Sequence, residues 1–342
     1  MSARIHGAAG KPPGGQDKIT PCAGTWRGPN TPDTKSTQMI LLASRLLACL
    51  LAGCSLAALA NDLPPLSHQV AGGDSEYIVR PGDFLIAIGA RFGLPPPLLA
   101  QDNAVPYAAL IHPGQRFRIH NPHIVPATLD DGILINIPQR MLFHFNQGRL
   151  LDAYPVGLGK PATPTPRGEF EIVSRVKNKT WVVPTSIQEE MRREGKVVRL
   201  EVPPGPDNPL GTHWLGLSVW GYGIHGTIAP SSVYQFRSHG CIRLHPDDIA
   251  ELFERTPVGQ TGQLVYQPVL LAVTEDGRIL LEIHPDIYNK GVDPASIVRE
   301  MAEAHGLSQA IDWPRANEVI AAQDGLARDV SRLPRNGAKG TP

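Results

Sequence analysis

Cysteine is scarce in this sequence of 342 residues, which contains only four. Cys22, Cys49 and Cys54 lie in or before an apolar segment near the start, so Cys241 is the only cysteine of the remaining sequence. A structural disulfide is therefore excluded in that part of the protein. A lone thiol is open to oxidation, so Cys241 is either a buried inert residue or one retained for its reactivity.

The sequence also lacks an excess of charge and the spacing patterns of a metal site. Thirty-two basic residues balance thirty-two acidic ones, so no overall positive field would gather nucleic acid. His213, His245 and Asp247 lie near Cys241 in the sequence, but no Cys-x2-Cys or His-x3-His spacing is present. The run GLGK at 157–160 lacks two residues of a phosphate-binding loop and is predicted to be a turn. The sequence thus predicts no metal, no cofactor and no nucleic-acid partner.

Glycine and proline, by contrast, are abundant, with 34 residues each. They favour short strands, turns and loops over long helices. A hydrophobic content of 42% is enough for at least one sizeable core, and 342 residues are many for one domain. We therefore expect a mainly β protein of two or three modules.

The most apolar stretch covers residues 39–60. Its unbroken apolar run of fourteen residues, 46–59, is too short to span a bilayer comfortably and ends just before polar residues. We interpret 39–60 as a signal peptide and the polar residues 1–38 as an unstructured upstream segment, with translation expected to start at Met39. The residues around Cys54 resemble the lipobox of bacterial lipoproteins, so the protein is either soluble in the periplasm or lipid-anchored at Cys54.

Residues 76–120 form the first segment with an organised pattern of apolar residues. The expected elements are a strand at 77–79, a turn at 81–83 that caps a helix at 84–92, a second helix at 98–103 and a closing strand at 116–119. The expected order is βααβ.

This segment resembles the LysM module. The hallmarks present are Tyr77, Val79, Gly82-Asp83-Phe84-Leu85, Phe92-Gly93, Asn103 and Pro113-Gly114-Gln115. Modules of this family bind glycans that contain N-acetylglucosamine, peptidoglycan among them. The resemblance therefore implies glycan contacts from Gly82, Asp83, Phe84 and Asn103. Phe84 departs from the family, where Thr or Ser is commoner, and the alternative is a βααβ spacer without a ligand.

Alternating and continuous apolar runs begin at Gly132 and predict strands joined by tight turns. These strands are expected at 133–137, 141–145, 150–156, 169–173, 180–183, 214–220 and 263–266, with one short helix at 246–254. Residues 131–267 are therefore predicted to form a β-sandwich or barrel. Residues 268–342 are predicted to form a short α+β extension of unknown role, with a hairpin around Asp276 and a helix from Asp293 to about His305.

The segment 238–243, Ser-His-Gly-Cys-Ile-Arg, places a thiol beside an imidazole, a hydroxyl and a cation. A thiol attacks only as thiolate, so a catalytic cysteine needs a base or a positive charge nearby. His239 would point the wrong way in a regular strand or helix, whereas His225 on a neighbouring strand can present its ring to Cys241. We therefore predict that His225 is the base.

These residues resemble the L,D-transpeptidase catalytic domain, also called the YkuD domain. Its signature is His-Gly, a loop, and then Ser-His-Gly-Cys-x-Arg or Asn, and residues 165–170 also match the family's Thr-Pro-x-Gly-x-Phe. The resemblance implies that Cys241 is the nucleophile, His225 its base and the Gly226 carbonyl the group that orients the ring. The resemblance also implies that Ser238, His239 and the Cys241 backbone N–H surround the oxyanion, with Gly240 in the same catalytic set. Arg243 would hold the motif or substrate carboxylates, and Tyr222 would bind the substrate.

The resemblance implies an exported cysteine transpeptidase of the cell wall. The enzyme would attack the stem tetrapeptide of peptidoglycan, release D-alanine and pass the acyl group to an amine. That amine would belong either to another stem peptide or to a lysine of an outer-membrane lipoprotein, and glycan strands would be further partners. A hydrolase of the same fold and a catalytically silent wall-binding protein are the alternatives.

Overall fold

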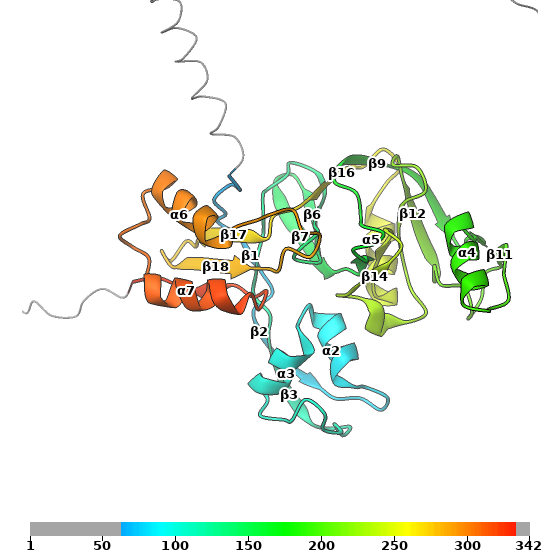
Figure 1. Ribbon diagram of the computed structural model, residues 1–342, viewed down its shortest axis with the longest axis horizontal. Helices are drawn as coiled ribbons and strands as arrows, with labels where there is room; N and C mark the ends of the chain where they lie inside the picture. Colours follow the sequence, from blue (N-terminus) through cyan, green and yellow to red (C-terminus); the bar gives the residue numbers. More distant parts are fainter. Residues whose placement is uncertain (1–62, 333–342) are drawn as a thin grey trace, which may run out of the picture. The chain divides into compact units, whose positions relative to one another are not determined.

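The computed structural model describes residues 63–332 (Figure 1). The predicted upstream segment, the signal peptide at 39–60 and Cys54 lie outside the described residues. Within 63–332, no helix is both long enough and apolar enough to cross a membrane. The order of elements confirms a mainly β fold preceded by a βααβ module.

The βααβ module is a two-stranded antiparallel sheet with two helices. Its elements are β2 (Asp74–Ile78), α2 (Leu85–Phe92), α3 (Pro96–Asp102) and β3 (Arg116–His120). Apolar side chains from the helices and the sheet form a buried cluster that includes Ile88, Leu99 and Phe117. The module therefore has a core largely of its own.

Two details of this module differ from the expectation. The turn before α2 does not cap the helix with a side chain: Phe84 occupies the N-cap position. Asp83 Oδ2 instead accepts hydrogen bonds from the Tyr77 hydroxyl and the Arg80 N–H, both at 2.7 Å. The second helix begins at Pro96, inside the proline run and not after it, because proline is tolerated in the first turn of a helix.

An eight-stranded mixed sheet forms the second module. In spatial order its strands are β15 (Ile242–Arg243), β13 (Gly223–His225), β12 (His213–Leu217), β9 (Gly168–Lys177), β16 (Thr261–Val265), β5 (Gly132–Asn136), β6 (Met141–Asn146) and β7 (Arg149–Pro155). The pairs β13–β15 and β5–β16 are parallel, and the other pairs are antiparallel. β9 is longer than predicted because it pairs with β16 at one end and with β12 at the other.

This sheet closes on itself. Gly157, just after β7 at one edge, exchanges two backbone hydrogen bonds of 2.8 Å with Arg243 of β15 at the other edge. Apolar side chains from all eight strands consequently meet in one core, which includes Ile133, Leu215 and Ile242. The sequence is compatible with either a β-sandwich or a barrel. The bridge between the two edge strands is the feature of a barrel.

Shorter elements complete this module. They are β8 (Leu158–Gly159), which pairs with β14 (Phe236–Ser238), the 3-10 helix η1 (Pro230–Ser232), α5 (Pro246–Arg255), and the insertion between β9 and β12 with β10 (Trp181–Val182), α4 (Thr185–Arg193) and β11 (Glu201–Val202). The helix α5 confirms the expectation at 246–254. The helix α4 was not predicted, and it buries none of its side chains.

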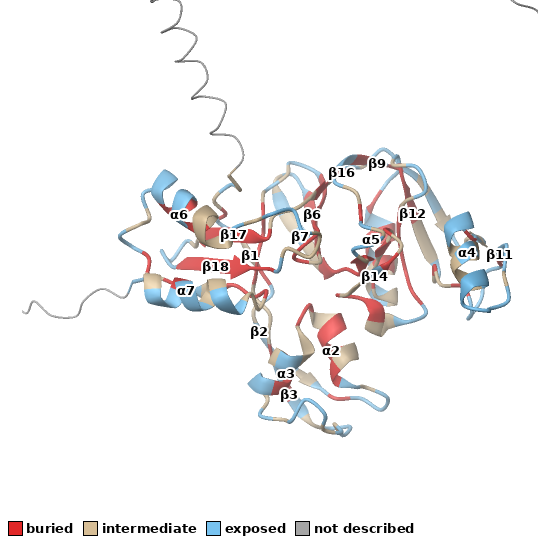
Figure 2. Ribbon diagram, in the orientation of Figure 1, coloured by how far each residue is buried: buried red, intermediate tan, exposed pale blue. Residues whose placement is uncertain are grey.

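The C-terminal extension is a small α+β unit, as predicted. Its elements are β17 (Val269–Val273), β18 (Ile279–Ile283), α6 (Pro294–Ala304), α7 (Trp313–Ala322) and β19 (Arg328–Asp329). Asp293 caps α6 by accepting from the Ala295 N–H. Figure 2 shows β18 fully buried, while α6 and α7 keep exposed residues on their outer faces. The second of these helices, α7, was not predicted.

A buried polar cluster joins the extension to the other two modules. There β1 (Val70–Ala71) pairs with β4 (His123–Ile124), beside β18. Glu282 Oε1 lies 3.0 Å from His123 Nδ1, 2.8 Å from His284 Nε2 and 2.9 Å from Gln139 Nε2. Burial alone would raise the pKa of Glu282, but the two histidines outweigh it and hold the pKa at about 2.

Candidate active site

Cys241 lies in a tight turn between β14 and β15. The Ser238 hydroxyl donates a hydrogen bond of 2.6 Å to the Cys241 carbonyl oxygen and accepts one of 3.0 Å from the Gly240 N–H. Ser238 is almost fully buried. Its side chain therefore holds the shape of the turn that presents the thiol.

Gly240 is required in this turn for two reasons. Its φ of +106° lies in a region that side chains with a Cβ rarely adopt. A Cβ at this position would also lie 2.5 Å from the ring of Tyr222, which packs against the turn from the segment before β13. A larger residue at position 240 would displace Tyr222 or the turn that carries Cys241.

His225 lies on β13, the strand that pairs with β15 directly after Cys241. In the parallel pair β13–β15, Ile224 is opposite Ile242, and both side chains are fully buried in the core. Side chains alternate between the two faces of a strand. His225 and Arg243 therefore project to the face opposite the core, and Cys241 lies in the turn just before this strand.

Two contacts fix the His225 ring. Its Nδ1 lies 2.6 Å from the carbonyl oxygen of Gly226. The ring also stacks on Trp214 of β12, its direct partner in the antiparallel pair, with centroids 5.7 Å apart and planes 18° apart. When Nδ1–H donates to the Gly226 carbonyl, Nε2 carries the lone pair and is the atom that can accept a proton.

Burial decides the protonation of the thiol and the imidazole. It lowers the pKa of His225 to about 4, and the charge of Arg243 acts in the same direction. Burial also raises the pKa of Cys241, although a backbone hydrogen bond of Gly223 and the charge of Arg243 oppose this. At neutral pH the resting site therefore holds a neutral thiol, whose Sγ faces the Gly221 carbonyl at 3.8 Å, and a neutral imidazole.

Arg243 is a largely enclosed cation beside the thiol. Among residues 63–332, its Nε is a buried atom without a hydrogen-bond partner. Burial lowers its pKa, and the neighbouring charge that opposes this effect is that of Cys241. A carboxylate or a thiolate that entered this site would therefore meet an unshared positive charge.

His239 is directed toward the insertion between β9 and β12. Its Nε2 lies 2.6 Å from Glu190 Oε2 of α4, and Glu190 Oε1 accepts a hydrogen bond of 3.0 Å from Lys160 Nζ. The hydrogen bonds from Lys160 and His239 hold the pKa of Glu190 at about 2. The helix α4 is thus attached to the cysteine motif through one carboxylate.

A hydrogen-bond chain from the C-terminal extension also reaches the cysteine turn. The Tyr288 hydroxyl donates to the Gly159 carbonyl at 2.7 Å and accepts from the Thr165 N–H at 3.1 Å. The Thr165 hydroxyl in turn donates to the Gly240 carbonyl at 2.9 Å. The Tyr288 ring stacks on Tyr266, with centroids 5.7 Å apart.

The four predicted glycan-binding residues lie in the βααβ module, apart from the cysteine motif in the sequence. The Asn103 amide donates to the carbonyl oxygens of Leu99 and Arg118 and accepts from the Arg118 N–H. The Asp83 carboxylate is bonded within its own turn. Phe84 is 48% exposed, and Gly82 is exposed as well. Phe84 is therefore the side chain of this set that is most available to a ligand.

Sequence reasoning missed four residues that the structure brings to the cysteine motif. They are Lys160, Glu190, Trp214 and Tyr288. Only Trp214 lay in a predicted strand, and nothing in the sequence placed it against His225. In the described part of the chain, no three His, Cys, Asp or Glu side chains gather as a metal ion would require.

Two protein-family models match parts of this chain. The L,D-transpeptidase catalytic domain matches residues 130–270, and the LysM domain matches residues 77–120. The L,D-transpeptidase YkuD of Bacillus licheniformis is 34% identical over 186 residues, which cover 54% of this chain and 94% of that protein. The chain belongs to the L,D-transpeptidase family.

Two further comparisons cover different shares of this chain. ErfK/SrfK of Salmonella typhimurium is 28% identical over 284 residues, or 80% of this chain and 92% of that protein. A solved structure of the E. faecium L,D-transpeptidase catalytic domain acylated by ertapenem is 21% identical and covers 41% of this chain and 100% of that domain, with a TM-score of 0.32. The similarity to ErfK/SrfK thus extends well beyond residues 130–270 of this L,D-transpeptidase.

Proposed function

We propose that this L,D-transpeptidase joins peptidoglycan stem peptides to amines through a covalent intermediate on Cys241. The observation that supports the proposal is the parallel pairing of β13 with β15, which sets His225 opposite Arg243, two residues after Cys241, with His225 Nδ1 bonded to the Gly226 carbonyl. This arrangement leaves Nε2 of His225 to take the proton of the thiol.

In the first half-reaction, Cys241 gives its proton to His225 and its sulfur attacks the carbonyl carbon of the third residue of a stem tetrapeptide. The bond to the terminal D-alanine breaks, and His225 returns the proton to the departing amine. The Cys241 N–H, presented by the turn around Gly240, stabilises the oxyanion. Ser238 and His239 contribute by holding that turn, since their polar atoms are engaged with the Cys241 carbonyl and with Glu190.

In the second half-reaction, an acceptor amine attacks the thioester, loses its proton to His225 and regenerates the thiol of Cys241. Arg243 binds a carboxylate of the stem peptide, which is consistent with the buried, unbonded Nε of its guanidinium. Tyr222 lines the same site from the segment that packs on Gly240. The acceptor is an amine of a second stem peptide or a lysine of an outer-membrane lipoprotein.

The remaining segments place the enzyme at its substrate. The signal peptide at 39–60 exports it to the periplasm, as a free protein or one anchored at Cys54. The LysM module binds glycan strands, with Phe84 as its exposed aromatic contact. A weak binding module linked to the catalytic domain raises the effective concentration of the wall around Cys241.

The test supplies a tetrapeptide donor with no acceptor, with a diaminopimelate-containing stem peptide, or with a lysine-ended lipoprotein peptide. Mass spectrometry then identifies the products. We expect an amide-linked product with one of the acceptors, and none with Cys241→Ala or His225→Ala. Accumulation of tripeptide alone under every condition would show a hydrolase, and product from Cys241→Ala would exclude the cysteine mechanism.

A further inference from the structure

A cavity of about 700 Å³ lies between the flank of the LysM module and the C-terminal extension. One wall comes from β1, β2 and the end of β3, and includes Val70, Asp74 and His120. The other wall comes from the β17–β18 hairpin, α7 and β19. None of the lining residues lies within 130–270, so the cavity is separate from the cysteine motif.

Main-chain hydrogen bonds hold the two walls together. The Ala327 N–H donates to the Pro122 carbonyl at 2.9 Å. On the same side, the Ser67 N–H donates to the Leu271 carbonyl at 3.0 Å and the Val273 N–H donates to the Ser67 carbonyl at 2.9 Å. The cavity is therefore a built feature of the fold, and its size is in the range of sites for small ligands and short peptides.

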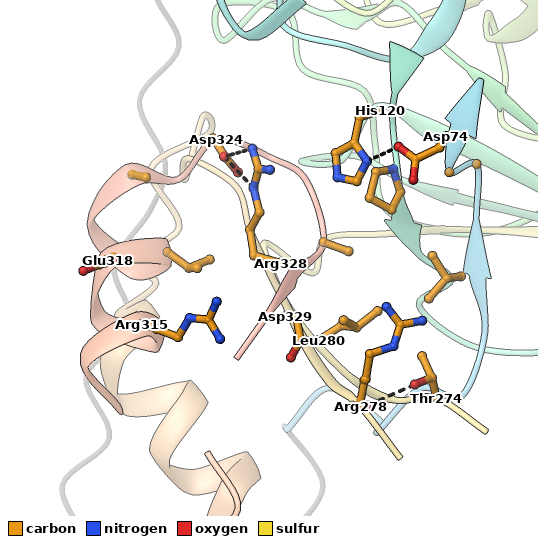
Figure 3. A pocket seen from close by; sticks show the side chains of 17 residues that line it. Asp74, His120, Thr274, Arg278, Leu280, Arg315, Glu318, Asp324, Arg328 and Asp329 are labelled. Carbon is orange, nitrogen blue, oxygen red and sulfur yellow. Dashed lines mark hydrogen bonds and ion pairs between the residues drawn. The ribbon is translucent and has the colours of Figure 1, made fainter. Parts of the chain in front are cut away.

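Three guanidinium groups from three different elements surround the cavity (Figure 3). Arg328 is bonded to Asp324 through Nε and Nη2. Arg278 donates a hydrogen bond from its Nε to Asp276, and its other N–H groups are available to a ligand. The Arg315 side chain of α7 forms no ion pair or hydrogen bond with any residue in 63–332.

The carboxylates of the cavity are, by contrast, mostly engaged. Asp74 is paired with His120 at 2.7 Å, and Asp324 is paired with Arg328. Asp329 accepts from the Ser331 N–H, and Glu318 extends away from the three arginines in Figure 3. Arg315 and the remaining N–H groups of Arg278 are therefore the cationic groups that a ligand can reach, beside the carboxylates of Glu318 and Asp329, which are unpaired within 63–332.

The floor between these charges is apolar. Leu280 and Ala327 are buried there, and Val70 and Val319 flank them. A ligand that fits must combine carboxylates, spaced so that Arg278 and Arg315 can both be reached, with small apolar groups. An acidic peptide that contains alanine has both the carboxylates and the small apolar groups. A neutral glycan has no carboxylates.

We propose that this cavity binds the acidic stem peptide of peptidoglycan, at a site separate from the one that acylates Cys241. The identity of the peptide rests on the function proposed above. The LysM module would hold the glycan strand while the neighbouring cavity holds a stem attached to it. When one of two linked sites has bound the polymer, the effective concentration of the polymer at the other site rises. The extension would therefore help to keep the enzyme on the wall.

Tryptophan offers a reporter for each site. The described residues hold four, and Trp313 at the start of α7 is the only one in the C-terminal extension, while Trp214 and Trp220 flank the cysteine motif. We would label the full chain with fluorotryptophan in the Cys241→Ala background and titrate it with the free tetrapeptide stem. The ¹⁹F resonance of Trp313 should shift saturably, independently of the shifts of Trp214 and Trp220.

The double variant Arg278→Ala, Arg315→Ala should weaken the Trp313 titration about tenfold or more, since two charged contacts are lost. The matched control is Arg299→Ala, an exposed arginine of α6 that does not line the cavity. The active-site resonances should still shift in both variants. An unchanged Trp313 titration in the double variant, no Trp313 shift with the peptide, or an equal shift with a neutral chitin tetrasaccharide would each overturn the proposal. Product formation by the unmodified enzyme, measured separately, shows whether the proposed function fails instead.

Discussion

The hydroxyl of Tyr288 donates a hydrogen bond of 2.7 Å to the carbonyl oxygen of Gly159. The same hydroxyl accepts from Thr165, whose own hydroxyl is bonded to the Gly240 carbonyl next to Cys241. The C-terminal extension therefore supports the turn that carries Cys241, although its sequence holds no chemical motif. This contact gives the extension a positioning role that can be measured.

Tyr288→Phe keeps the ring and its stacking on Tyr266 but removes both hydrogen bonds. We expect kcat to fall about tenfold with little change in KM, because losses of about 1 kcal/mol at each unpaired group loosen the Gly240 turn. Steady-state kinetics with a soluble tetrapeptide measure both constants. The matched control is Tyr107→Phe, an exposed tyrosine of the LysM module. A lower melting temperature with an unchanged kcat would show that Tyr288 acts on stability alone.

The resting thiol should behave as a neutral group. Burial raises the pKa of Cys241 from its ordinary value of 9.0 and lowers the pKa of His225 to about 4, so neither group is charged near neutrality. The rate of alkylation of Cys241 by iodoacetamide should therefore keep rising up to and beyond about pH 9. His225→Ala should leave this profile nearly unchanged while it abolishes turnover. A plateau between about pH 5 and pH 8 would instead indicate a preformed thiolate–imidazolium pair.

Glu190→Gln should free the insertion between β9 and β12. The substitution keeps the size of the side chain but removes the charge that binds Lys160 and His239. We expect faster tryptic cleavage at the exposed Arg192 and Arg193 of α4, together with a lower kcat/KM.

The control for this experiment is Glu189→Gln, an exposed neighbour that forms no ion pair within 63–332. The pKa of Glu190 is depressed to about 2, so wild-type cleavage should be slow at neutral pH, where the carboxylate is charged. Equal cleavage rates in wild type and Glu190→Gln would contradict the attachment of α4 through this residue.

Glu282→Gln tests the buried cluster that joins the modules. Removing one partner of a buried charged cluster costs about 3 kcal/mol, so the free energy of unfolding near pH 7 should fall by roughly that amount. In the folded state the pKa of Glu282 is held at about 2, below its ordinary 4.5. Its contribution is therefore complete above about pH 4.5 and is lost as the pH falls toward about 2.

Urea unfolding at several pH values measures this contribution. The wild type should lose stability through that acid range, and Glu282→Gln should lose less of it. Glu275→Gln, an exposed residue of the same hairpin, is the control and should follow the wild type. If stability fell equally with pH in wild type and Glu282→Gln, Glu282 would be excluded as the source of the acid-induced loss of stability.

Local patterns in the sequence were enough to predict the modules and to locate the cysteine motif. Alternating apolar runs predicted the strands, the turn around Asp276 predicted the hairpin, and the βααβ order followed from helical spacing between two short strands. The spacing of 225–226 and 238–243 singled out Cys241 and His225. Signals of this kind are readable because each depends on residues close together in the chain.

The partners of these residues depend on contacts between distant segments. Glu190 meets His239 across 49 positions, and Tyr288 meets Gly159 across 129, so no local pattern could pair them. The helix α4 escaped prediction for a related reason, since it is held by Glu190 and not by a buried face. The pKa of His225 is likewise set by burial among strands that come together only when the eight-stranded sheet closes, because desolvation depends on the surrounding atoms and not on the residue type.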